Sequence, residues 1–187
     1  FIEENMKIST LETSRLLLVP SSMKYFEERS RIASDIENTR FMMFLPATSE
    51  ETYAYIKKSE TQWESENQTL FEFDILLKEK NNKYIGGISF ELLFDNPEIV
   101  KKIGKHCAHM GWILDKNFWN KGFASEGARC VLEFAKSLGV KTMIAQCDAD
   151  NIGSWRVMEK VGMKKSSDDG IRYNKSEPNL AKACNSL

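Results

Sequence analysis

The pattern of apolar and polar residues is most regular along residues 71–77. Apolar and acidic positions alternate there in the order Phe71, Glu72, Phe73, Asp74 and Ile75, and Leu77 keeps the apolar phase. A period of two residues is typical of a strand with one buried face. Asn81 and Asn82 then supply a turn, and residues 84–94 predict a second strand, so we expect a β-hairpin followed by the polar loop 95–98.

Helical spacing follows a short first strand in the N-terminal part of the chain. Residues 15–19 are mostly apolar and precede a proline, after which Ser21 or Ser22 can cap a helix that runs to about Ser34. Residues 48–51 read Thr-Ser-Glu-Glu, a capping-box pattern that predicts the start of a second helix. One face of that helix holds Thr52, Tyr55, Ile56, Ser59 and Trp63.

Strands and helices alternate in the second half of the chain. We expect a strand over 106–114, a helix over 125–138, a strand over 142–147 and a helix over 151–161. The first helix has an apolar stripe of Ala128, Val131, Leu132, Ala135 and Leu138, and the second has Ser154, Val157, Met158 and Val161. Gly139 and Gly162 stop these helices, and Asp150 or Asn151 can cap the second. This order predicts a parallel crossover in one mixed-sheet α/β domain.

The composition is that of an ordinary globular protein. The chain has 187 residues, of which 42% are hydrophobic and 28% charged, enough for one domain with a sizeable core. We expect a single domain over 1–187, with its core at about 11–164 and a poorly patterned tail over 166–187 in which residues 179–187 look helical. The formal net charge of −1 gives no support to nucleic acid or an anionic membrane as the main partner.

Location and metal chemistry can also be judged from the sequence. No apolar stretch approaches the roughly 20 residues of a membrane span, and residues 1–5 lack the features of a signal peptide, so a cytoplasmic protein is expected. The four cysteines are far apart, which predicts reduced thiols rather than a zinc ribbon or a disulfide framework. His106 and His109 would point to opposite faces of a strand, so no metal site is predicted.

A candidate phosphate-binding turn follows the strand that ends at Leu114. Gly122 lacks a side chain, so backbone N–H groups can approach an anion there, and the start of the next helix favours negative charge. Lys121 can contact a phosphate or lie in solvent, and Phe123 is expected to anchor the turn in the core. A plain turn with a helix cap would give the same Gly-x-Ala spacing of Gly122 and Ala124.

The context of this turn points to a known family. Residues 119–124 read Trp-Asn-Lys-Gly-Phe-Ala, and residues 151–163 read Asn-Ile-Gly-Ser-Trp-Arg-Val-Met-Glu-Lys-Val-Gly-Met. Together they resemble the two signature motifs of the GCN5-related N-acetyltransferase (GNAT) family, over about residues 11–164. Trp119 occupies the first position of the first motif, and in this respect the chain resembles the branch of RimJ/RimL-type ribosomal-protein N-terminal acetyltransferases. Asn120 occupies a position where glycine is common in the family. The resemblance implies a GNAT fold, a mixed and mostly antiparallel sheet flanked by helices.

The resemblance also implies an acetyl-CoA-dependent enzyme, with acetyl-CoA as its co-substrate. The positions that would bind acetyl-CoA are Trp112, Ile113, Leu114, Trp119, Asn120, Lys121, Gly122, Phe123, Ala124, Ser125, Asn151 and Ser154. Asn151 would hydrogen-bond the pantetheine arm. Many relatives protonate the departing thiolate with a tyrosine of the second motif, but this chain has Met158 there, so Ser154 is the expected proton donor.

The remaining catalytic groups are expected on the strands. A backbone N–H near Trp112 to Leu114 would polarise the thioester carbonyl, and Gly111 would mark a bulge that opens the sheet. The candidates for the base that takes the proton of the amine are Glu91, Asp74, Glu72 and His109, of which Glu91 is preferred. Each of them also fits a solvent-facing position on an alternating strand. Among the tryptophans, Trp155 is expected to be the exposed one.

The sequence does not decide between several classes of acceptor amine. Relatives end in two strands that shape the acceptor pocket, and the tail of this chain shows no such pattern. The acceptor is either a peptide N-terminus that begins with Ser or Ala, or a small amine such as a polyamine, an aminoglycoside or an amino acid; an acidic cleft would favour polyamines and aminoglycosides. A module that binds coenzyme A without turnover, and an α/β domain unrelated to coenzyme A, are the alternatives from other classes. A monomer or a homodimer is expected.

Overall fold

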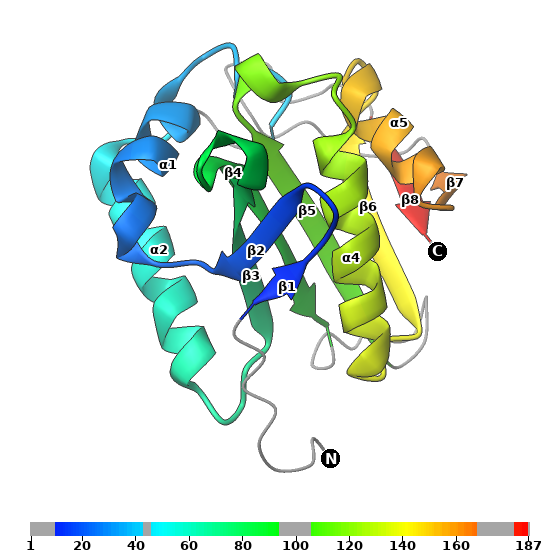
Figure 1. Cartoon of the computed structure of the whole chain (residues 1–187). Helices are drawn as coiled ribbons and strands as arrows, with labels where there is room; N and C mark the ends of the chain where they lie inside the picture. Colours follow the sequence, from blue (N-terminus) through cyan, green and yellow to red (C-terminus); the bar gives the residue numbers. More distant parts are fainter. Residues whose placement is uncertain (1–9, 43–45, 94–105, 168–181, 187) are drawn as a thin grey trace.

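One mixed sheet forms the centre of the molecule (Figure 1). The computed structural model describes residues 10–42, 46–93, 106–167 and 182–186. Its eight strands follow the order β1-β2-β3-β4-β5-β6-β8-β7. They are β1 (Leu11–Glu12), β2 (Leu16–Pro20), β3 (Leu70–Leu77), β4 (Lys83–Leu92), β5 (Cys107–Leu114), β6 (Thr142–Asp148), β7 (Lys164–Ser167) and β8 (Lys182–Ser186). All neighbours are antiparallel except β5 and β6. The predicted mixed and mostly antiparallel sheet is therefore confirmed.

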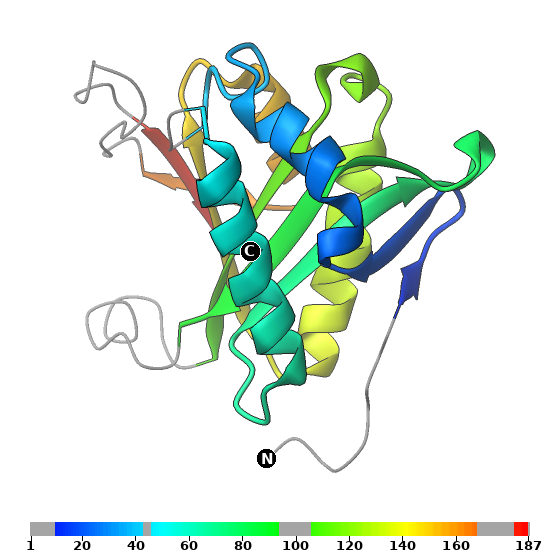
Figure 2. The same ribbon diagram turned by 90° about the vertical axis from the view of Figure 1, so that its left-hand side faces the viewer.

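In the described part of the chain, two pairs of helices cover the two faces of this sheet (Figures 1 and 2). They are α1 (Phe26–Ser34), α2 (Ser49–Glu64), α4 (Phe123–Ser137) and α5 (Ile152–Lys160), joined in places by short 3₁₀ turns at Met23–Tyr25, Lys78–Lys80 and Lys116–Phe118. α1 and α2 pack on one face, and α4 and α5 pack on the other. Because α4 follows β5 and leads into β6, it is the predicted parallel crossover. No helix in the described part of the chain is long and apolar enough to cross a membrane.

The capping residues predicted from the sequence are correct for one helix and wrong for another. Thr48 and Glu51 form the predicted capping box, with Thr48 Oγ1 accepting the Glu51 N–H at 3.2 Å and a Glu51 carboxylate oxygen accepting the Thr48 N–H at 2.8 Å. The predicted serine cap of the first helix is wrong, because Ser22 precedes a 3₁₀ turn and makes no side-chain cap bond. Its N–H instead donates to Asp74 on β3 at 3.1 Å.

β3 is buried on both faces, which corrects the prediction of a half-buried strand. On one face, Phe71 and Phe73 pack edge-on against Phe134 of α4. On the other face, Glu72 and Asp74 lie under α1 and α2 with exposed fractions of 2% and 1%. Arg29 of α1 donates to Glu72 at 2.6 Å and lies 3.4 Å from Asp74, which compensates part of the cost of burying two carboxylates.

The C-terminal segment is a strand rather than the expected helix. β8 is inserted between β6 and β7 and pairs with both in antiparallel register. The two closing strands that the sequence did not show are therefore β7 and β8. Pairing with two neighbours satisfies the backbone of β8, and this tertiary contribution outweighs a weak helical pattern. The loop predicted at 95–98 lies outside the described residues.

Candidate active site

The sheet opens between β5 and β6. The two strands pair from Cys107 and Thr142 to Met110 and Ala145, and no further. Within the described part of the chain, β5 continues to Leu114 with β4 as its only partner strand. Its edge toward β6 is thus unpaired beyond Met110, and the parallel strands diverge there.

The direction of each peptide group on this edge follows from the hydrogen bonds at both ends of β5. Cys107 accepts from Leu93, and Asp115 donates to Ile85, so the odd-numbered residues bond toward β4. The carbonyl of His106 accepts from Lys141 next to β6, which gives the even-numbered residues the opposite direction. The N–H groups of Trp112 and Leu114 therefore point into the opening, whereas that of Ile113 points toward β4.

Gly111 is not a bulge, in contrast to the prediction. The pairing of β4 and β5 runs without a register shift from Gly86 and Leu114 to Leu92 and Ala108. The opening comes from the end of the pairing between β5 and β6. A Cβ atom at Gly111 would meet no heavy atom within 4 Å, so there is free space beside this residue.

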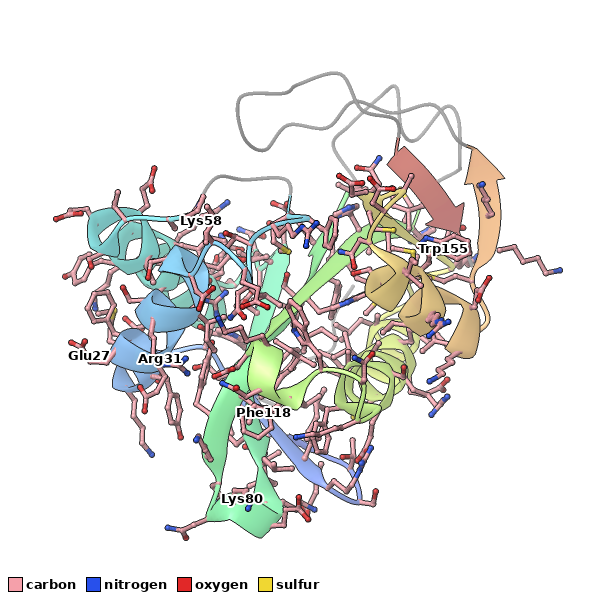
Figure 3. All side chains as sticks on the ribbon, turned by 90° about the horizontal axis from the view of Figure 1, so that it is seen from above. Glu27, Arg31, Lys58, Lys80, Phe118 and Trp155 are labelled. Carbon is pink, nitrogen blue, oxygen red and sulfur yellow. The ribbon has the colours of Figure 1, made fainter. Side chains whose placement is uncertain are left out.

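A compact turn carries the chain from β5 to α4. Asp115 is buried and accepts the N–H of Asn117 at 2.9 Å and an N–H of the Arg31 guanidinium at 2.6 Å. Burial alone would raise the pKa of the Asp115 carboxyl, but these hydrogen bonds outweigh burial and lower it. Trp119 closes the turn by donating its indole N–H to the Leu114 carbonyl at 2.9 Å. Figure 3 shows Arg31 on α1 beside this turn, which carries Phe118.

The start of α4 presents free backbone donors. Gly122 precedes the helix in the left-handed conformation, with φ of +80°, and has no capping side chain. The first N–H groups of a helix have no carbonyl one turn earlier, so those of Phe123, Ala124 and Ser125 remain available to an anion. Phe123 is buried and holds the turn against the core, as expected.

The start of α5 lies beside the same opening. Asn151 caps the helix, as predicted, with its Oδ1 accepting the Ser154 N–H at 3.1 Å. This leaves the Asn151 side-chain NH₂ group to meet a ligand. Met158, in the position of the family's tyrosine, is 1% exposed and packs in the core.

The exposed tryptophan is Trp119 rather than Trp155. Trp119 is 37% exposed. Trp155 is only partly buried but packs against the core, and its indole N–H donates to the Ala149 carbonyl at 3.2 Å. The prediction for Trp155 was wrong because helical spacing did not reveal the contact with the end of β6.

These elements enclose a cavity of about 550 Å³. Every residue predicted to bind acetyl-CoA lines it, except Lys121, which donates to the Asn117 carbonyl at 2.8 Å. The chain after α1 contributes Asn38, Phe41 and Met42, which the sequence did not indicate. Since α1 and α4 lie on opposite faces of the sheet, the cavity is lined from both faces. The end of α1, the 115–122 turn and the start of α5 all lie at the upper side of the molecule in Figure 1.

Two cations in the cavity wall were also missed. Arg156 and Lys160 of α5 are exposed and line the cavity. Asp150 is the only acidic residue among the described lining residues. A basic pair on a helix resembles any solvated surface in the sequence, so only the packing of α5 beside α4 could identify it.

None of the four candidate bases lines this cavity. Glu72 and Asp74 lie in the buried cluster with Arg29, where Tyr55 also donates to Glu72 at 2.7 Å. Burial raises the pKa of Asp74 to about 7, and the charge of Arg29 offsets only part of that rise. Glu72 and Asp74 therefore have structural roles in this buried cluster.

The other two candidates face each other across β4 and β5. Glu91 is exposed and lies directly opposite the partly buried His109, on the sheet face that also carries Gly111. Burial lowers the pKa of His109, which Glu91 opposes, so the imidazole is largely neutral at pH 7. No group of three or more histidine, cysteine or acidic side chains in the described residues is arranged to hold a metal ion.

Known proteins are similar to this chain over most of its length. The family model described as acetyltransferase (GNAT) domain matches residues 15–164. An uncharacterized N-acetyltransferase, YnaD of Bacillus subtilis (strain 168), is 30% identical over 159 residues, which cover 83% of this chain and 82% of that protein.

Solved structures share the fold. A GNAT-family acetyltransferase from Bacillus anthracis superposes with a TM-score of 0.77 at 24% identity, over 95% of this chain and 97% of that one. An acetyltransferase from Salmonella typhimurium that modifies the N-terminal serine of ribosomal protein L7/L12 has a TM-score of 0.76 at 13% identity, over 94% and 95% of the two chains.

Proposed function

Because the chain belongs to the family of GNAT-domain acetyltransferases, we propose that it transfers the acetyl group of acetyl-CoA to the α-amine of a peptide or protein N-terminus. Membership of the family makes the chain an acetyl-CoA-dependent N-acetyltransferase. The peptide acceptor and the roles of single residues are our proposal. The observation that carries it is the cavity in which the free N–H groups of β5 and of the α4 start line one space.

The proposed binding mode uses these backbone groups in order. The N–H groups of Phe123, Ala124 and Ser125 hold the pyrophosphate, helped by the positive end of the α4 dipole. The open edge at Trp112 and Leu114 bonds the amides of the pantetheine arm, and one of these N–H groups polarises the thioester carbonyl. The side-chain NH₂ group of Asn151 donates to the arm from the opposite wall.

The proposed reaction is a direct attack by the amine. A bond forms between the amine nitrogen and the carbonyl carbon of the acetyl group, and the bond from that carbon to sulfur breaks. The hydroxyl of Ser154 hydrogen-bonds the departing sulfur and gives it a proton, which the hydroxyl regains from water. Met158 cannot take this role, since a thioether has no proton to give and the side chain lies in the core.

Glu91 remains the proposed base. It stands on the sheet face that carries Gly111, where there is free space next to β5. Because Glu91 does not line the cavity, it would take the proton of the amine through water. A neutral His109 directly opposite is the other acceptor of that proton within the same pair.

The scarcity of acidic residues supports a peptide acceptor over a polyamine or an aminoglycoside. Asp150 is the only acidic residue among the described residues that line the cavity, whereas a polycationic acceptor would need an acidic wall. The structural similarity to the acetyltransferase of L7/L12 supports the same acceptor class and a RimJ/RimL-like assignment. We also propose a cytoplasmic location, where acetyl-CoA and new N-termini are available.

A pooled acceptor assay tests this function. The protein is incubated with acetyl-CoA and a mixture of Ser- and Ala-starting peptides, polyamines, aminoglycosides and amino acids, and the products are identified by mass spectrometry. We expect one acetyl group on the α-amine of a peptide, and none when the Gly122→Asp variant is used. Acetylation of a small amine alone would contradict the peptide proposal. Binding of acetyl-CoA without any product would favour a non-catalytic module.

A further inference from the structure

A pair of cations lines the same cavity as the start of α4. Arg156 and Lys160 are four residues apart on α5, so their side chains lie on one side of that helix. Both line the cavity whose other wall contains Gly122, Phe123 and Ala124. They therefore share one space with the backbone donors of α4.

Neither cation is paired with an acidic side chain of the described residues. Neither side chain forms an ion pair with any residue of the described segments. By contrast, Lys116 of the turn between β5 and α4 binds both Asp35 and Glu37, at 2.9 and 2.8 Å. A cavity wall with two unpaired cations beside a helix start has a surplus of positive charge, which an anionic ligand can satisfy.

The position of α5 is fixed by a contact with α4. An Arg129 side-chain N–H of α4 donates to the Lys160 carbonyl at 3.1 Å, at the C-terminal end of α5. The two helices also share the core around Val131 and Val157. These contacts hold α5 against α4. Arg156 and Lys160 therefore line the cavity without any movement of α5.

The chemistry of coenzyme A contains one phosphate that the α4 start does not account for. The pyrophosphate suits the backbone N–H groups of α4, but the nucleotide also carries a 3′-phosphate monoester. A phosphate monoester holds a charge of about −1.5 to −2 at pH 7 and is recognised well by the planar guanidinium of an arginine and by a lysine point charge.

We propose that Arg156 and Lys160 form the binding site for the 3′-phosphate of coenzyme A, so that the enzyme selects coenzyme A over 3′-dephospho-coenzyme A. The inference rests on the proposed binding mode of acetyl-CoA in this cavity. It assigns a specificity role to two side chains that touch no reacting atom.

Titration calorimetry with two coenzymes tests the site. Coenzyme A and 3′-dephospho-coenzyme A are titrated into the native protein and into an Arg156→Gln/Lys160→Gln variant. Charge-assisted hydrogen bonds of this kind predict that the native protein binds coenzyme A about ten- to a hundredfold more tightly than the dephospho form. The double variant is expected to bind both coenzymes with the affinity that the native protein has for the dephospho form.

A matched variant controls for the loss of two positive charges. Lys58 of α2 and Lys80 of the β3–β4 turn are exposed and lie away from α5, which carries Trp155 (Figure 3). Lys58→Gln/Lys80→Gln removes the same charge and is expected to keep the full selectivity. Thermal unfolding of both variants checks that each is folded.

The outcomes separate this inference from the proposed function. Equal affinity of the native protein for the two coenzymes would overturn the inference and leave the acetyl-CoA site standing. Full selectivity in the Arg156→Gln/Lys160→Gln variant, or an equal loss of affinity for both coenzymes, would also overturn it. If the native protein bound neither coenzyme, the placement of the cofactor itself would fail.

Discussion

Met110 of β5 and Ala145 of β6 are the last residues that pair these two strands. Beyond them the even-numbered residues of β5 keep their peptide groups directed at a partner strand that has moved away. Backbone groups in this position are strong donors and acceptors that need a partner when they are shielded from water. The end of one strand pairing thus creates a row of donors for an extended ligand, without any polar side chain.

Gly122→Asp is expected to abolish acetyl-CoA binding. The residue has a φ of +80°, and a side chain there would add bulk 3.4 Å from the Arg15 guanidinium as well as a negative charge at the proposed pyrophosphate site. We expect the affinity measured by calorimetry to fall more than about a hundredfold, as like charges at close range predict.

Gly139→Asp is the matched control for this change. Gly139 has a φ of +87° and follows the other end of α4, where a side chain meets open space. The strain and the added charge are similar, so its stability is expected to fall by a like amount while acetyl-CoA affinity stays unchanged. If the Gly122→Asp variant bound acetyl-CoA with native affinity, the pyrophosphate would not bind at this turn.

Ser154→Ala is expected to lower turnover and leave binding intact. The hydroxyl acts only on the leaving sulfur, so kcat should fall about a hundredfold, at the low end of the range for acid catalysis. The dissociation constant of acetyl-CoA should change less than about twofold, since the interaction strengthens only in the transition state. Ser154→Thr keeps a hydroxyl and should retain more activity. A native kcat in Ser154→Ala would return the residue to a structural role at the start of α5.

Glu91 and His109 can be told apart as bases by single variants. If Glu91 takes the proton, Glu91→Gln lowers kcat about a hundredfold and His109→Gln changes it little. The measurement is kcat across pH with saturating acetyl-CoA. The opposite result, with the loss in His109→Gln and an acidic limb below the ordinary histidine pKa because burial lowers that pKa, would assign the base to His109.

Asp74 should make stability depend on pH. Its pKa is raised to about 7 by burial, and Arg29 lies closer to Glu72 than to Asp74. The folded state therefore binds a proton that the unfolded state releases near pH 4. This contribution is fully present below about pH 4 and is lost as the pH rises through about 7, by an amount on the order of 2–4 kcal/mol.

Denaturant unfolding of the native protein and of Asp74→Asn at several pH values measures this effect. Asparagine does not titrate, so the variant does not lose this stability as the pH rises. The free energy of unfolding of the variant should therefore increase relative to that of the native protein between pH 5 and pH 8. A constant difference between the two proteins across this range would show that Asp74 is ionised throughout, with Arg29 as a sufficient partner.

Local patterns predicted the parts of the structure that depend on neighbours in the sequence. The Thr48 and Glu51 cap involves residues three positions apart, and Asn151 caps α5 by a bond to Ser154. The turn at Gly122 was also found from a local signal, because a residue without a side chain just before a helix lets backbone N–H groups approach an anion. The residues of both motifs then met in one cavity, since each motif follows one of the two strands that diverge.

The errors concern contacts between distant segments. Glu72 alternates with apolar residues as a solvent-facing side chain would, and only the arrival of Arg29 on α1 makes its burial possible. The insertion of β8 beside β6 depends on which strand edge is free, which no local pattern contains. Arg156 and Lys160 look like ordinary surface cations until α5 packs beside the start of α4. Each case is a tertiary contribution that overrides a local preference.

Amide hydrogen exchange at single-residue resolution, with and without coenzyme A, tests whether the cofactor binds at the opening between β5 and β6. We expect exchange to slow at Trp112 and Leu114, whose N–H groups point into the opening, and at Phe123, Ala124 and Ser125. Ile113 between them should not change, because its N–H already points to β4. Protection spread evenly along β5, or confined to residues away from the opening between β5 and β6, would contradict the proposed cofactor site.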